Sequence, residues 1–233
     1  MDQGRQGRRA FVIGGVTATL AALVPRGHAL AQDVVVEDWH EHTAGATGVP
    51  AGWRKYETPR GHPAYDFQIG ETRGRKALTL RSAGDHSTIA KEVTVDLRAT
   101  PKLTWSWCVT TLPRGADLRQ KATSDATGHI FVVWPRFPEL LRSRLIGYVW
   151  DQTVAPGTIV KSRKTGTVSF VVVRSGERGL GEWMTETRDV VADYRTIFGE
   201  APESPRAVAL SIDTNDTGAR AEASFGAIAF TSR

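Results

Sequence analysis

Two tryptophans spaced two residues apart are the first residues in this sequence that could do chemistry. They lie in the segment TWSWCV, residues 104–109. Its alternation is typical of a β-strand, so Trp105 and Trp107 project from one face and Ser106 and Cys108 from the other. An aromatic face can stack on the C–H surface of a sugar ring, or it can fill the core between two packed sheets. For each single tryptophan we expect the core, because tryptophan is substantially buried on average.

Two further aromatic residues alternate in the segment IGYVWD, residues 146–151. If this strand shared a sheet with the segment TWSWCV, the two pairs would line one aromatic face, as in carbohydrate-binding sandwiches. The candidate ligand-binding residues on such a face are Trp105, Trp107, Tyr148 and Trp150.

Polar candidates gather in the long loop 111–127 and in the strand that follows it. Asp117, Lys121 and Asp125 in the loop, with His129 after it, could form a polar cluster at the rim of a groove. The alternative is a solvated loop whose surface ion pairs contribute little.

Catalytic groups are present without a recognisable arrangement. His129, Arg144 and Tyr148 could serve a polysaccharide lyase as base, charge clamp and proton donor. The sequence contains no GxSxG or HExxH motif, phosphate-binding glycine loop or Cys/His zinc spacing. We therefore assign no catalytic residue.

A short acidic turn follows a strand near the C-terminus. Asp213, Asn215 and Asp216 carry the hard oxygen atoms that calcium prefers, which makes them candidate calcium ligands. The turn lacks the glutamate of an EF-hand, and Asn, Asp and Gly also favour tight turns through their backbone preferences alone. We favour turn chemistry, and we expect no other cofactor.

The pattern of apolar runs predicts an all-β fold. About ten short runs, among them Ile89–Leu97 and Ala207–Ile212, are separated by Gly, Pro, Asp and Asn. Such spacing favours an antiparallel β-sandwich, jelly-roll-like, over alternating βαβ units. Two segments predict short helices between the strands. Asp189–Gly199 has apolar residues at helical spacing, with Asp189 as the N-cap and Gly199 as the C-terminal stop. Pro138–Leu145 predicts a shorter helical turn that begins with Pro138.

The N-terminus has the features of an export signal. Residues 1–31 combine a basic start, an uncharged apolar run over 10–24 and the small-x-small pattern Ala29-Leu30-Ala31. Arg8-Arg9 also matches a twin-arginine signal, and both export routes stay open. Fifteen apolar residues are too few to span a bilayer comfortably. We expect a periplasmic or secreted single domain, residues 32–233, without stable membrane insertion.

The charge of that domain argues against a nucleic-acid partner, and its cysteine content excludes an internal disulfide. The leader holds four of the 30 Lys and Arg and one of the 25 Asp and Glu, which leaves a net charge near +2. Without a basic tract, nucleic acid is an unsupported partner. Cys108 is the sole cysteine, so an internal disulfide is impossible, and we interpret it as a small buried strand residue rather than a nucleophile.

Several segments in order resemble one bacterial exported family. They are LTWSWCV, LPRGAD with Lys121, IFVVW, GYVWD, GEWMTETRDVVADYRTIFG and IDTNDTGARAEASFGAIAF. Together they resemble the family catalogued as domain of unknown function 3047, over roughly residues 33–231. The resemblance implies an exported jelly-roll-like sandwich and brings no reaction or ligand.

These observations favour a non-catalytic, exported β-sandwich that binds a glycan or another envelope component. The alternatives are a polysaccharide-active enzyme, lyase or glycosidase, on a jelly roll, and a scaffold for a protein partner. A glycan binder needs aromatic rings in an open groove, an enzyme needs titratable groups converging there, and a protein partner needs a flatter apolar patch.

Overall fold

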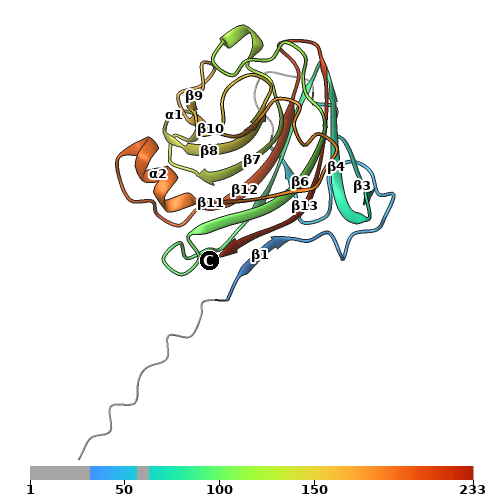
Figure 1. Cartoon of the computed structure of the whole chain (residues 1–233). Coiled ribbons are helices and arrows are strands. Elements are labelled where there is room, and N and C mark those ends of the chain that lie inside the picture. Colours follow the sequence, from blue (N-terminus) through green and yellow to red (C-terminus); the bar gives the residue numbers. More distant parts are fainter. Residues whose placement is uncertain (1–31, 57–62, 233) are drawn as a thin grey trace, which may run out of the picture. The chain divides into compact units, whose positions relative to one another are not determined.

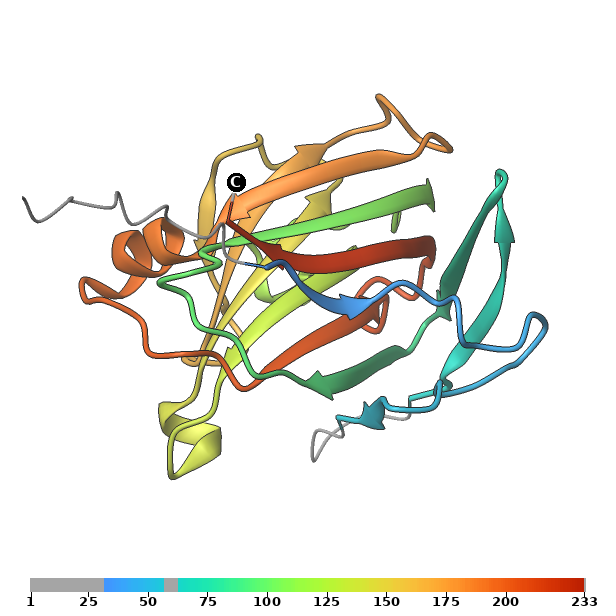
Figure 2. The same cartoon turned by 90° about the horizontal axis from the view of Figure 1, so that it is seen from below.

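The chain from residue 32 onward folds as two β-sheets packed face to face. The structure is a computed structural model, and it describes residues 32–56 and 63–232. The predicted leader, residues 1–31, therefore lies outside the described residues. The first sheet consists, in spatial order, of β11 (Met184–Asp189), β6 (Lys102–Thr111), β13 (Arg220–Thr231), β4 (Arg75–Ala83) and β3 (Asp66–Thr72). The short strand β1 (Val34–Glu37) pairs with β13, beside which it runs in Figure 2.

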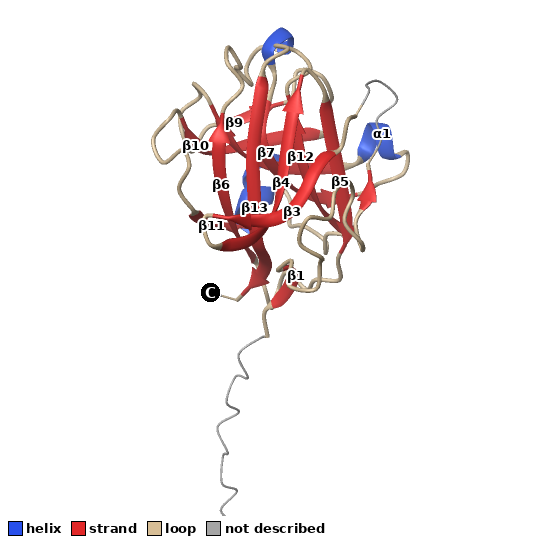
Figure 3. Ribbon diagram, turned by 90° about the vertical axis from the view of Figure 1, so that its right-hand side faces the viewer, coloured by secondary structure: helices blue, strands red, loops and turns tan. Residues whose placement is uncertain are grey.

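The second sheet lies behind the first in the view of Figure 3. Its spatial order is β2 (Arg54–Lys55), β5 (His86–Glu92), β12 (Ala207–Asp213), β7 (Ala126–Trp134), β8 (Arg144–Asp151), β10 (Val168–Ser175) and β9 (Ile159–Lys161). Antiparallel pairing dominates both sheets, and the parallel pair of β8 and β10 is an exception to it. The predicted all-β sandwich is confirmed.

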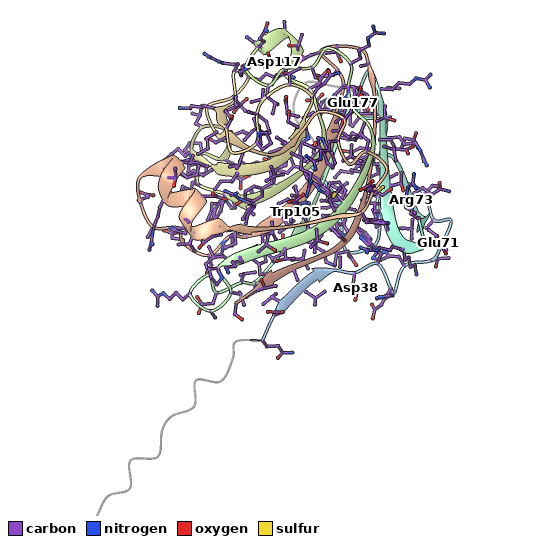
Figure 4. The ribbon with its side chains drawn as sticks, viewed as in Figure 1. Asp38, Glu71, Arg73, Trp105, Asp117 and Glu177 are labelled. Carbon is purple, nitrogen blue, oxygen red and sulfur yellow. The ribbon has the colours of Figure 1, made fainter. Side chains whose placement is uncertain are left out.

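Large aromatic side chains fill the space between the sheets. Trp105 and Trp107 on β6 are completely buried, as are Tyr148 and Trp150 on β8. Strands β6 and β8 belong to opposite sheets, so the two pairs meet across the core: the Trp105 and Tyr148 rings stack 5.3 Å apart and those of Trp107 and Trp150 lie 5.8 Å apart. The side chain of Trp105 lies between the two layers in Figure 4. The expectation that each of these tryptophans belongs to the core is confirmed.

The helices lie outside the sheets. Helix α2 (Val190–Phe198) has the predicted caps: the Asp189 side chain accepts a hydrogen bond from the Ala192 amide, and Gly199 adopts the left-handed conformation. Its Tyr194 ring packs edge-on against Trp134 of β7, 4.7 Å away, so α2 closes one end of the sandwich (Figure 1). The one-turn helix α1 (Glu139–Arg142) follows Pro138, and a 3-10 turn, η1 (Lys121–Thr123), interrupts the loop before β7. Within the described residues neither α-helix has the length and hydropathy needed to cross a bilayer.

One local expectation is wrong. The alternation in residues 89–97 predicts one strand, but β5 ends at Glu92, and Val95 and Leu97 reach the core from an irregular segment. Here Asp96 accepts hydrogen bonds from the amides of Ala99 and Thr100 and turns the chain. The acidic turn after Asp213 carries the chain from β12 in the second sheet to β13 in the first.

Candidate functional site

A groove runs over the outer face of the second sheet, on the side away from the sandwich core. It has a volume of 630 Å³ and is lined by residues of β2, β5, β7, β8, β10 and β12 and of their connecting loops. Small side chains on two neighbouring strands give the groove its depth, namely Thr88 and Ala90 on β5 and Ala207, Ala209 and Ser211 on β12.

Beyond the small side chains of β5 and β12, the floor of the groove is formed by aromatic rings on β7 and β10. His129 and Phe131 of β7 stack with ring centroids 5.4 Å apart, and the Phe170 ring of β10 lies 5.6 Å from His129 and 6.1 Å from Phe131. Gly147 of β8 pairs with both Phe131 and Phe170 in the sheet, and a Cβ atom there would approach their rings to 2.6 and 3.0 Å. The missing side chain is therefore what lets the two rings lie over β8.

This outer face is apolar where a solvent-facing sheet surface would ordinarily be polar. The groove residues Phe131, Val133, Leu145 and Phe170 belong to a second hydrophobic cluster, separate from the core between the sheets. All nine residues of β7 are buried, on both of its faces. The residues that this cluster shares with the groove lining therefore form an apolar bottom of the groove.

Charged and hydroxyl side chains form the two ends of the groove. At one end lie Arg54 and Glu92, paired at 3.4 Å, with Tyr56 and, from α1, Glu139. Figure 3 shows α1 close to β5 on that side. At the other end lie His86, Asp213 and Lys164, which belongs to the loop between β9 and β10. Each end therefore offers hydrogen-bond donors and acceptors to a ligand that lies along the aromatic floor.

Two titratable groups in the groove have strongly shifted pKa values. Burial lowers the pKa of the His129 imidazole to about 4, so His129 is neutral at pH 7; its Nδ1 lies 3.4 Å from the Ser211 carbonyl oxygen. Burial raises the pKa of the Asp213 carboxyl to about 7, because it outweighs the opposing effect of the nearby Lys164 ammonium. The His129 end of the groove therefore combines a neutral imidazole with a carboxyl group that titrates near neutrality.

The Lys164 ammonium lies among the three candidate calcium ligands. Its Nζ is 3.7 Å from Asp213 Oδ2, 2.5 Å from Asp216 Oδ2 and 3.3 Å from Asn215 Oδ1. A positive charge belonging to the chain itself thus balances the acidic turn. Among the described residues no group of three or more His, Cys, Asp and Glu side chains is arranged to hold a metal ion.

Of the eight candidate ligand-binding residues, His129 alone lines the groove. Trp105, Trp107, Tyr148 and Trp150 lie in the core, and the Tyr148 hydroxyl donates a hydrogen bond to Asp193.

The three loop candidates lie elsewhere. Asp117, in the loop at the top of Figure 4, pairs with Arg119 through both oxygens, while Lys121 is exposed at the start of η1. The buried Asp125 accepts hydrogen bonds from the amides of Asp216 and Thr217, so it holds the connection between β12 and β13.

Sequence reasoning missed most of the groove. Phe131, Gly147, Phe170 and the alanines of β5 and β12 are individually ordinary strand residues. The available signal was the run GHIFVVW, residues 128–134, which is apolar at both alternating sets of positions. A strand of that kind is buried on both faces, so a two-layered sandwich needs something further to cover its outer face.

Comparison with known proteins gives a family and a set of distant structural matches. The family model described as "Protein of unknown function (DUF3047)" matches residues 51–229. No curated protein matches the chain.

Among solved structures, one match is the family 11 carbohydrate-binding module of the cellulosomal cellulase Lic26A-Cel5E of Clostridium thermocellum. It has 8% identity and a TM-score of 0.47, over 88% of this chain and 97% of that one. Another is the family 30 module of the cellulosomal cellulase Cel9D-Cel44B of the same organism, with 11% identity, a TM-score of 0.44 and coverage of 87% and 98%. What those modules bind is a property of those proteins, so a function for this groove has to be argued from its own residues.

Proposed function

This chain belongs to the DUF3047 family, whose model carries no assigned activity. From the residues that line the groove, we propose that it is an exported protein that binds a polysaccharide chain. Export is supported by the leader pattern in residues 1–31. The observation that carries the binding proposal is the aromatic floor of His129, Phe131 and Phe170 in an open groove of 630 Å³.

The chemistry of the lining suits a sugar chain. A pyranose ring presents C–H groups on its faces and hydroxyl groups around its edge, so it needs an apolar platform bordered by hydrogen-bonding groups. Phe131 and Phe170 supply the platform. Side chains along the walls supply donors and acceptors, among them Thr88, Ser143, Ser162, Thr165 and Ser211.

The length of the groove favours a chain over a single sugar. Its two polar ends lie at opposite ends of β5, because Glu92 at one end and His86 at the other are the last and first residues of that strand. The groove thus runs along β5 and the neighbouring β12, in which each residue adds ≈ 3.3 Å. β5 has seven residues, so these two ends are about 20 Å apart, which provides room for several sugar units in a row.

A groove-filling substitution tests the proposal. Ala209→Trp on β12 places an indole on the floor, whereas Ala83→Trp places one on an exposed position of β4 in the other sheet. Native gel electrophoresis of the purified protein through soluble β-glucans, mannans and xylans should show retardation by at least one polymer. Ala209→Trp should abolish that retardation and Ala83→Trp should retain it. Retardation by none of the polymers, or equal retardation of both variants, would refute the proposal.

A second candidate function is cleavage of the bound polysaccharide. It is favoured by one observation: Asp213, whose carboxyl has a pKa of about 7, lines the groove together with the neutral His129. A carboxyl group of this kind can act as a general acid near neutral pH. Release of reducing ends from a retarding polymer, lost in Asp213→Asn, would establish cleavage; retained binding with no release in the wild type would establish a binding protein.

A further inference from the structure

A second pocket, which we call the basic pocket, adjoins the groove at the edge of the second sheet. It has a volume of 450 Å³ and is lined by Arg119, Lys161, Arg163, Ser162, Val160, Ile159 and Thr158. Three of these seven side chains are cationic, and none is acidic. The groove, by contrast, mixes both signs of charge along its walls.

The loop between β9 and β10 joins the two cavities. Ser162 lines both of them, Arg163 lines the basic pocket, and Lys164 and Thr165 line the groove. The Ser162 hydroxyl accepts hydrogen bonds from the amides of Lys164 and Thr165, which fixes the turn that separates them. A polysaccharide that extends from the groove past Lys164 therefore reaches the basic pocket within the length of one short loop.

The charges in the basic pocket are unequally neutralised. Asp117 holds Arg119 through two hydrogen bonds of 2.9 and 2.8 Å, and this contact lowers the pKa of Asp117 to about 2. Lys161 and Arg163 are exposed, and in the described part of the chain no carboxylate lies within 4 Å of either charged group. Lys164 differs, since Asp213 and Asp216 already neutralise it. Lys161 and Arg163 are thus the cations left for a ligand.

We infer that the basic pocket binds an acidic substituent, a carboxylate or a sulfate, carried by the same polysaccharide whose sugar rings lie in the groove. The inference rests on the proposed function, and it names the ligand as an acidic polysaccharide. Oppositely charged groups at a solvated surface attract modestly and in a salt-dependent way, so the pocket adds selectivity to the binding that the groove provides.

Paired neutral and acidic polymers test this inference. The purified full chain is titrated with hydroxyethylcellulose, laminarin, galactomannan and arabinoxylan, and with the carboxymethylated form of each. We expect at least one carboxymethylated polymer to bind about fivefold more tightly than its neutral counterpart, the size expected for one or two solvated ion pairs. The difference should disappear in 500 mM NaCl.

Two double variants separate the basic pocket from general surface charge. Lys161→Gln with Arg163→Gln should bring the acidic polymer to the affinity of the neutral one. Arg98→Gln with Arg220→Gln removes the same charge from exposed positions that line neither cavity, and it should leave the difference intact. Equal affinity for both polymers in the wild type, or an equal effect of the two double variants, would overturn the inference.

The same titrations distinguish this inference from the proposed function. In one outcome, the neutral polymer binds, Ala209→Trp abolishes that binding, and the double variant of Lys161 and Arg163 leaves all affinities unchanged. The groove proposal then stands and the inference on the basic pocket fails. If the acidic polymer binds through Lys161 and Arg163 but Ala209→Trp has no effect, the groove proposal fails. Absence of binding to every polymer refutes both.

Discussion

Gly147 on β8 lies opposite Phe131 on β7, so closely that a Cβ atom at position 147 would stand 2.6 Å from the phenylalanine ring. The backbone at this glycine is not in the left-handed region, so its role is to leave space. The space is taken by the Phe131 ring and by Phe170 from the other side, and these two rings form most of the platform on the groove floor.

Gly147→Ala should therefore change the floor without straining the backbone. Because the added methyl group must displace Phe131, we expect a loss of about 1–3 kcal/mol in the free energy of unfolding, typical of overpacking. We also expect weaker retardation by any polysaccharide that the wild type binds. Urea denaturation and affinity electrophoresis measure the two effects. Gly70→Ala on β3, where nothing lies within 4 Å of the added atom, is the matched control. Unchanged binding in Gly147→Ala would show that the rings are not the platform.

Trp107→Ala should damage stability rather than recognition. The Trp107 side chain is fully buried and its ring lies within 5.5–6.2 Å of Trp105, Trp150 and Phe225. Removing a buried aromatic side chain of this size costs about 3–5 kcal/mol. Urea denaturation measures that cost, and polysaccharide binding by the folded fraction should stay at the wild-type level. A stable variant that has lost binding would contradict the assignment of Trp107 to the core.

Replacement of Lys164 should make the acidic turn sensitive to calcium. In Lys164→Ala, Asp213 and Asp216 lose the ammonium that balances them and keep oxygen atoms suited to a hard cation. We expect millimolar calcium to raise the melting temperature of this variant and to leave that of the wild type unchanged. Arg163→Ala, which removes a neighbouring charge, should behave as the wild type does. Stabilisation of the wild type by calcium would show that the ion displaces Lys164.

Asp213 should make stability depend on pH between 4 and 7. Its pKa is about 7 in the folded protein, against 3.8 as its ordinary value, so the folded chain holds the proton more tightly than the unfolded chain. Its contribution to the free energy of unfolding is thus fully present below about pH 4 and is lost as pH rises to about 7.

The comparison with Asp213→Asn isolates this contribution. His129 titrates with the opposite sign, because its pKa is lowered to about 4 and its contribution is lost as pH falls below its ordinary value of 6.5. The wild type and Asp213→Asn share His129, so the difference between their unfolding free energies reports Asp213. The unfolding free energy of the wild type minus that of Asp213→Asn should decrease from pH 4 to pH 7. If this value stays constant or increases, the pKa of Asp213 is not raised in the folded protein.

The sequence predicts the sandwich well because the fold depends on local periodicity. Strands such as β6 and β12 alternate or carry dense apolar runs, and the caps Asp189 and Gly199 define α2 by their chemistry alone. The prediction fails at residues 93–97, where the same alternation occurs in a segment that Asp96 turns away from the sheet. Periodicity reports which side chains are buried there, but it does not report whether the backbone has a neighbouring strand.

The site is less predictable because it depends on which strands are neighbours. Phe131, Gly147 and Phe170 are far apart in the sequence and become one surface only through the order β7-β8-β10, whose second pair is parallel. The most conspicuous aromatic residues, Trp105 and Trp107, face the opposite sheet instead. His129 is the one candidate ligand-binding residue that lines the groove, and it lies on β7, the strand that is buried on both faces.

The location of a bound oligosaccharide tests the central claim most directly. The purified, isotope-labelled protein would be titrated with an oligosaccharide prepared from a retarding polymer while its amide and aromatic NMR resonances are followed. We predict that the largest shifts occur at Phe131, Phe170, His129 and Ala209, which surround the groove. Saturable shifts confined to β3, β4 and β13 of the first sheet, with the groove resonances unmoved, would contradict the account.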